Sequence, residues 1–128
     1  MYDSGHTAVS PARLFRCERV VHWHLADTAA DEVTDVSQHT VAEPAEAVRS
    51  IRRAVRDLAC VLPPAERDQA LNWVDGGGWI GALGALYRGE SCGFSLNHRG
   101  RRIEWTVHPY LGFRVDTGDL LPVVRPHG

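Results

Sequence analysis

Two histidines separated by one residue, His22 and His24, are the first residues in this sequence with the spacing of a chemical site. On a β-strand, side chains two residues apart point to the same face, so both imidazoles could reach one metal ion or one substrate. A metal ion needs further ligands, and Glu18 would lie about 13 Å from His22 along such a strand. We therefore expect no metal site, and metal binding through His22 and His24 is the third of three functional alternatives.

A second group of residues that could do chemistry lies near the C-terminus. If the chain forms a hairpin between them, Ser91 lies opposite His108, and Glu104 lies on the same face. A hydroxyl, an imidazole and a carboxylate are the groups used in acid–base and nucleophilic catalysis. The same residue types also occur on solvated sheet faces, and no nucleophile-elbow motif accompanies them. The candidate catalytic residues are His22, His24, Glu104 and His108.

Four arginines form the third candidate site, which we call the arginine stripe: Arg49, Arg52, Arg53 and Arg56. Their spacing of three and four residues places them on one side of a helix. Only Glu46 and Asp57 are spaced to neutralise them locally, although Asp31, Glu32 or Asp35 could do so from elsewhere in the chain. Guanidinium groups bind carboxylates and phosphates, so the stripe predicts recognition of a protein or small ligand that is acidic.

Composition limits the class of protein. The chain has 128 residues, 44% of them hydrophobic, and a net charge of -2, so we expect one domain and no general nucleic-acid binding. All 14 basic residues are arginine, which excludes Schiff-base chemistry on lysine and suggests a GC-rich bacterial genome. No apolar run is long enough for a membrane helix, and residues 1–12 do not resemble a secretory signal. Three scattered cysteines indicate free thiols, and we expect a cytoplasmic protein without a cofactor.

Hydrophobic periodicity predicts the elements of the first half of the chain. Alternation predicts a half-buried strand over residues 14–25, and residues 32–41 could form a weaker strand at a sheet edge. Pro44 begins an amphipathic helix whose apolar side carries Val48, Ile51, Val55, Leu58 and Leu62. A second helix over 64–75 ends at three glycines, Gly76 to Gly78.

Two Arg-Gly steps, at 88–89 and 99–100, divide the second half of the chain. If each is the centre of a tight hairpin, apolar residues oppose apolar residues throughout, and a shift of one residue would destroy this match. We therefore predict a C-terminal three-stranded antiparallel meander with its first strand in residues 79–87. The expected pairs are Leu83–Phe94, Ala85–Cys92, Cys92–Val107, Phe94–Trp105 and Leu96–Ile103.

The segment 79–87 also fits a short helix, with Trp79, Leu83, Leu86 and Tyr87 on one side. Its two glycines, Gly81 and Gly84, lower helix propensity, so we favour the strand. The predicted fold over 1–128 is a single α+β domain with an antiparallel sheet of about five strands and two helices on one face. Residues 1–12 and 120–128 are expected to be irregular.

These patterns favour a small interaction protein, similar in role to an immunity protein or an accessory factor, that recognises an acidic partner. The second alternative is a small enzyme of specialised metabolism that uses a histidine-rich sheet face for acid–base chemistry. An enzyme should hold its histidines in a concave pocket, whereas a binding protein should present a flat exposed patch.

Overall fold

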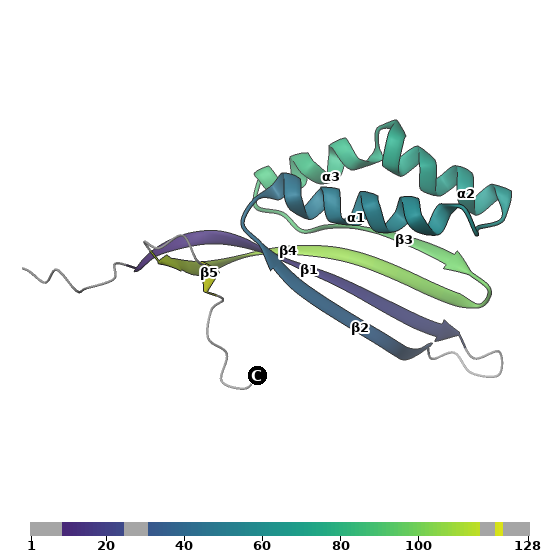
Figure 1. Ribbon diagram of the computed structural model, residues 1–128, viewed down its shortest axis with the longest axis horizontal. Coiled ribbons are helices and arrows are strands. Elements are labelled where there is room, and N and C mark those ends of the chain that lie inside the picture. The colour runs from purple at the N-terminus through teal and green to yellow at the C-terminus, as the bar shows by residue number, and fades with distance from the viewer. Residues whose placement is uncertain (1–8, 25–30, 116–119, 122–128) are drawn as a thin grey trace, which may run out of the picture.

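An antiparallel sheet and a layer of helices make up the computed structural model, which describes residues 9–24, 31–115 and 120–121 (Figure 1). The strands are β1 (Val9–His24), β2 (Asp31–Val41), β3 (Cys92–His98), β4 (Arg101–Val115) and the short β5 (Leu120–Leu121). The helices are α1 (Pro44–Ala59), α2 (Pro64–Leu71) and α3 (Gly78–Tyr87), with a π-helical turn, η1 (Asn72–Gly76), between the last two. The predicted α+β class is confirmed, with three α-helices in place of the expected two.

The strand order in the sheet is β2-β1-β4-β3, and β5 adds a short pairing to β4. Two hairpins, β1–β2 and β3–β4, are joined by the long pairing of β1 with β4. The possible edge strand over 32–41 is confirmed as β2. Strand β1 begins at Val9 and β5 at Leu120, inside the segments expected to be irregular, while 1–8 and 122–128 lie outside the described residues.

The Arg-Gly step at Arg99-Gly100 is a tight hairpin, as predicted. Both residues have positive φ, 53° and 79°, which is the requirement of a type I′ turn whose twist matches that of the strands. Phe94 lies opposite Trp105. The predicted register of β3 and β4 is confirmed, including the pairs Cys92–Val107 and Leu96–Ile103.

The prediction of a strand over 79–87, and with it the three-stranded meander, is wrong, because this segment forms α3. Its Arg-Gly step ends a helix instead of turning a hairpin. Gly89 has φ of 79° and donates to the Leu86 carbonyl, while Glu90 donates to the Ala85 carbonyl. These are the two hydrogen bonds of a Schellman cap, which uses a left-handed glycine just as a hairpin does.

Burial explains why the segment is helical despite its glycines. Ala82 and Leu86, four residues apart, are buried on the side of α3 that packs against the sheet. Each of Gly81 and Gly84 weakens the helix by about 1 kcal/mol, whereas full burial of one leucine contributes about 1.5–3 kcal/mol. Contacts with the sheet therefore outweigh the local preference.

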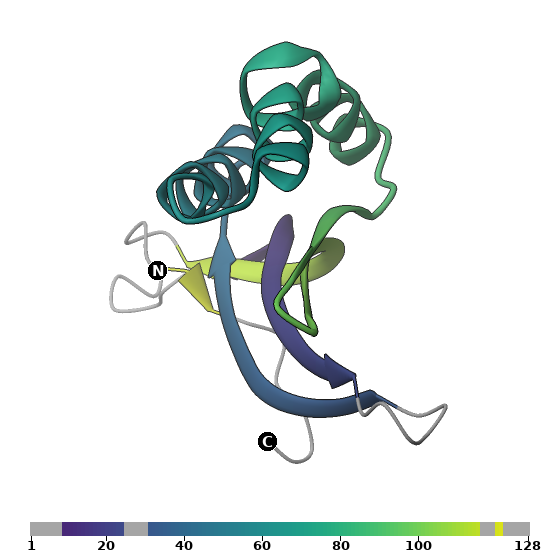
Figure 2. The same cartoon turned by 90° about the vertical axis from the view of Figure 1, so that its right-hand side faces the viewer.

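All the described helices lie on one side of the sheet (Figures 1 and 2). An aromatic stack joins the two layers: Phe94 of β3 lies 4.9 Å from Trp73 of η1 and 6.3 Å from Trp105 of β4, measured between ring centroids. The rest of the core packs with this stack and includes Phe15 and Cys17 of β1, Ile51 and Val55 of α1, Val74 of η1, Leu86 of α3, Leu96 of β3 and Val107 of β4.

We predict that Phe94→Ala lowers the free energy of unfolding by about 3 kcal/mol, because it removes the ring between two tryptophans. Urea denaturation followed by tryptophan fluorescence measures the loss. Phe113→Ala is the matched control, since Phe113 lies on β4 and is 45% exposed, and it should change stability much less. Equal losses in the two variants would contradict this account of the core.

Candidate functional site

The sheet face that points away from the helices is covered by none of the described helices, and we call it the open face (Figure 1). Phe15 and Cys17 of β1, and Trp105 and Val107 of β4, point into the core. Because side chains alternate along a strand, their neighbours point to the open face. The open face therefore carries Arg16, Glu18, Val20 and His22 of β1, Val33, Val36, Gln38 and Thr40 of β2, Ser95 and Asn97 of β3, and Arg102, Glu104, Thr106 and His108 of β4.

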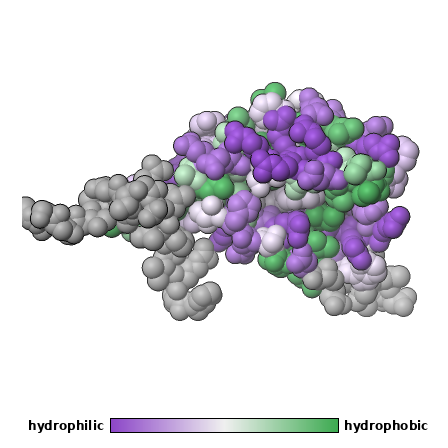
Figure 3. Space-filling view, in the orientation of Figure 1, coloured by the Kyte–Doolittle hydropathy of each residue, from purple (hydrophilic) through white to green (hydrophobic). Residues whose placement is uncertain are grey.

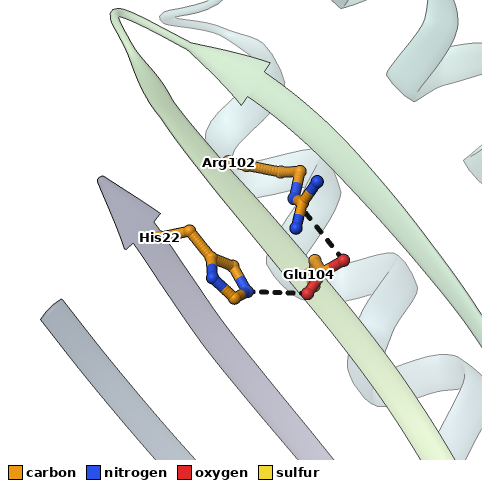
Figure 4. Close-up of polar contacts among 3 residues, drawn as sticks. All are labelled: His22, Arg102 and Glu104. Carbon is orange, nitrogen blue, oxygen red and sulfur yellow. Dashed lines mark hydrogen bonds and ion pairs between the residues drawn. The ribbon is translucent and has the colours of Figure 1, made fainter. Parts of the chain in front are cut away.

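On this face, the carboxylate of Glu104 contacts the side chains of both His22 and Arg102 (Figure 4). His22 Nε2 lies 2.7 Å from Glu104 Oε1, and Arg102 Nε lies 3.5 Å from Glu104 Oε2. His22 is opposite Arg102 in the register, so the carboxylate two residues further along β4 reaches both side chains. A carboxylate only accepts hydrogen bonds, so Nε2 of His22 carries a proton and donates it.

His108, another of the four candidate catalytic residues, is not part of this group. It lies four residues from Glu104 on β4, which separates their Cα atoms by about 13 Å. Its Nδ1 is instead 3.2 Å from the Ser91 hydroxyl, in the pairing that the sequence predicts. The structure thus brings His22 and Glu104 together and leaves His108 with a different partner.

His24 is the last residue of β1 and pairs with Asp31 of β2, but its side chain lies outside the described residues. The proposed metal pair His22 and His24 therefore stays untested. Among the residues that the structure describes, no group of three or more histidine, cysteine, aspartate or glutamate side chains is arranged to hold a metal ion.

The arginine stripe divides into two parts. Arg52 lies 4.3 Å from the Trp79 ring centroid and donates through Nε to the Val74 carbonyl at 3.0 Å, while Arg56 forms an ion pair with Asp75 at 2.5 Å. These two arginines therefore tie α1 to η1 and α3. Arg49 and Arg53 are exposed and have no ion pair within the described part of the chain, and hydrophilic side chains dominate the outer surface of α1 (Figure 3).

None of the acidic residues expected to neutralise the stripe forms an ion pair with it among the described side chains. The carboxylate that does so is Asp75, the last residue of the second predicted helix, and the residue spacing within α1 could not identify it. Asp35 pairs with Arg19 of β1 at 2.6 Å. The side chains of Asp31 and Glu32 lie outside the described residues.

Two of the three free thiols are protected by their surroundings. Burial raises the pKa of Cys17 to about 11, with smaller contributions from Cys92 and Glu46, and burial likewise raises the pKa of Cys92 to about 11. Cys60 is exposed, and its Sγ lies 3.2 Å from the Asp57 carbonyl oxygen. A thiol with so high a pKa holds little of the nucleophilic thiolate at neutral pH.

One residue of the open face, Arg16, was not among the candidate site residues. Its Nε atom is buried and has no hydrogen-bond partner among the described residues. It lies between Thr40 of β2 and His108 of β4 in the register. Alternation places Arg16 on the polar face of β1, but its neighbours come from the tertiary pairing.

Comparison with known proteins finds no matching family model, no matching curated protein and no matching solved structure. The function is therefore argued from the side chains themselves. No described helix is long and apolar enough to cross a membrane.

We predict that Arg52→Gln lowers the free energy of unfolding by about 1–2 kcal/mol, because it removes a cation–π contact and a hydrogen bond to Val74. The matched control, Arg49→Gln, removes an exposed arginine from the same helix and should change stability by less than about 0.5 kcal/mol. Urea denaturation of both variants measures the difference. Equal stability of the two would refute the structural role of Arg52.

We predict that iodoacetamide at pH 8 modifies Cys60 before Cys17 and Cys92 in the native protein. With a pKa of about 11, only about one thousandth of each protected thiol is ionised at pH 8, and both are at least partly buried. Because the pKa is raised, alkylation of Cys92 should accelerate as the pH rises. Peptide mass spectrometry measures each site, with urea-unfolded protein as the control. Alkylation of Cys92 as fast as that of Cys60 would contradict the assignment.

Proposed function

We propose that this protein is a small binding protein that recognises an acidic protein partner through the open face of its sheet, in the manner of an immunity protein or an accessory factor. The observation that carries the proposal is the one-sided covering of the sheet. The helices bury one face, and the other face presents side chains on four paired strands that no described helix covers. A rigid sheet holds such side chains in fixed positions, which lowers the entropy lost on binding.

The open face combines an apolar patch with polar surroundings. Val33 and Val36 of the edge strand β2 are 53% and 50% exposed, and Val20 lies opposite Val36 on β1. Polar pairs flank these valines. Glu18 accepts a hydrogen bond from Gln38 at 2.6 Å, and the His22–Glu104 contact lies on the other side. An apolar centre with a polar rim is the usual anatomy of a protein–protein interface.

The preference for an acidic partner comes from the cations that lack a carboxylate. Among the described side chains of the open face this is Arg16, since Arg102 is near Glu104. The arginine stripe contributes less than its four residues suggest, because Arg52 and Arg56 bind within the chain. Arg49 and Arg53 remain as a second basic surface on the opposite side of the molecule, and their role in binding stays a prediction.

A small acid–base enzyme is the second candidate, and one observation favours it. Glu104, which contacts His22, also lines a shallow hollow of about 420 Å³ at the β3 edge of the sheet, together with Ser95 and Thr106. A histidine oriented by a carboxylate is a common general base. We rank this candidate second because His108 and Glu104 do not converge on one point and the hollow is open to solvent.

We also propose that the protein works in the cytoplasm. Cys17, Cys60 and Cys92 are all free thiols, and free thiols are typical of reducing compartments. The presence of three thiols without a disulfide supports this location.

The binding proposal is tested by affinity purification from the source cells with three forms of the protein: wild type, Val36→Glu, and Arg49→Gln combined with Arg53→Gln. Val36 is half exposed, so glutamate should leave the fold intact while repelling an acidic partner. We expect one partner to bind wild type and the double variant, and its affinity for Val36→Glu to fall at least tenfold. Wild-type binding should weaken as salt increases.

Calorimetry with the purified partner measures these affinities, and thermal melting checks that each variant is folded. Loss of binding only in the double arginine variant would move the interface to α1. Equal affinity of all three forms would refute the proposed role of the open face.

A further inference from the structure

Arg16 is a partly buried cation to which the described residues supply no anion. Its Nε atom is buried and unpartnered, and the neighbours of Arg16 across the sheet are Thr40 on β2 and His108 on β4, neither of which is a carboxylate. Removing a guanidinium group from water without pairing it is unfavourable, and this is the reason that buried polar groups normally have partners. An arginine in this state is therefore prepared to bind an anion.

The nearest carboxylate on the same face does not fill this role. Glu18 lies two residues along β1, about 6.6 Å away at the level of the backbone. Its Oε2 accepts a hydrogen bond from Gln38 at 2.6 Å, toward β2. The next carboxylate on the open face, Glu104, is occupied by His22 and Arg102. The two acidic groups described on this face thus have partners, while Arg16 has none among the described residues.

Tyr110 of β4 reaches across β1 to Thr40, next to Arg16. Its hydroxyl lies 3.3 Å from the Thr40 hydroxyl, although Tyr110 belongs to β4 and Thr40 to β2, with β1 between them. The tyrosine side chain must therefore cross over β1, between Leu14, which pairs with Tyr110, and Arg16, which pairs with Thr40. This crossing brings two hydroxyl groups next to Arg16.

His108 borders Arg16 on the other side. Residues paired directly across two strands have Cβ atoms about 5 Å apart, so the two side chains are neighbours. The Ser91 hydroxyl lies 3.2 Å from Nδ1 and can donate to it. Nε2 of His108 has no partner among the described residues and is available to a ligand.

We propose that Arg16, His108 and the hydroxyl groups of Thr40 and Tyr110 form a binding site for an anionic oxygen group, and that this group is a side-chain carboxylate of the acidic partner. The second part of this inference rests on the proposed function. A guanidinium group offers two parallel N–H donors that match the two oxygens of a carboxylate, and the hydroxyl and imidazole groups add further hydrogen-bonding groups beside it. The guanidinium charge of Arg16 suits a singly charged ligand.

The site is tested by NMR titration of ¹⁵N-labelled protein with sodium acetate, and separately with inorganic phosphate, at constant ionic strength maintained with chloride. We expect acetate to produce a saturable shift of the Arg16 Nε–H signal and of the amide signals of residues 16 and 108. Arg16→Gln should abolish the amide shifts, and His108→Gln should weaken binding several fold. Arg53→Gln, which removes an exposed and unpaired arginine, is the matched control and should bind acetate as wild type does.

Thermal melting separates binding from folding. Because Arg16 is unpaired, Arg16→Gln should melt at the wild-type temperature or higher, whereas loss of a structural ion pair would lower it. If Arg16→Gln does not fold, His108→Gln still tests the site. The absence of a saturable shift, or equal shifts in wild type and in a folded Arg16→Gln variant, would overturn the proposal. Saturation by phosphate but not by acetate would overturn its assignment to a carboxylate.

The affinity of Arg16→Gln for the purified partner then tests the second part. A tenfold or greater loss supports the placement of a partner carboxylate on Arg16. A partner that binds Arg16→Gln normally but is lost with Val36→Glu would refute this placement while leaving the proposed function intact. A partner that binds both variants normally would refute the proposed function. The NMR titration with acetate would then decide by itself whether the anion site exists.

Discussion

The stacking of Phe94 between Trp73 and Trp105 is the contact on which the rest of the structure depends. It attaches the helical layer to the sheet, and it fixes which side of β3 and β4 points inward. Because side chains alternate along a strand, the inward position of Trp105 dictates that Glu104 and His108 point outward. The position of every candidate residue on the open face therefore follows from one aromatic cluster in the core.

The two halves of the open face differ in how their charges are balanced. The carboxylate of Glu104 contacts the side chains of His22 and Arg102, so its negative charge has partners within the chain. Around Arg16, the neighbours are hydroxyl groups and an imidazole, so the positive charge is not compensated by any described residue. An exposed pair of opposite charges contributes little to binding, whereas an unpaired and partly desolvated charge gains the most when a partner supplies its counterpart.

The arginine stripe shows how a single pattern can serve two purposes. All four arginines lie on one helix at a spacing that brings them together, yet Arg52 and Arg56 contact η1 and α3. The reason is that η1 and α3 pack beside α1, so part of its polar surface faces Val74, Asp75 and Trp79. Spacing along a helix identifies the shared side but does not reveal what packs against it.

Local periodicity by itself determined the amphipathic helix α1, the β3–β4 hairpin and the register that places Phe94 opposite Trp105, because these depend on residues close together in the chain. It did not distinguish the turn at Arg99-Gly100 from the helix cap at Arg88-Gly89, since both use a glycine with positive φ. Only the tertiary structure decided that residues 78–87 form a helix, through the burial of Leu86 against the sheet. The site at Arg16 also required the fold, because its neighbours Thr40 and His108 come from strands far along the chain, and pairing between distant segments is set by the packing of the whole domain.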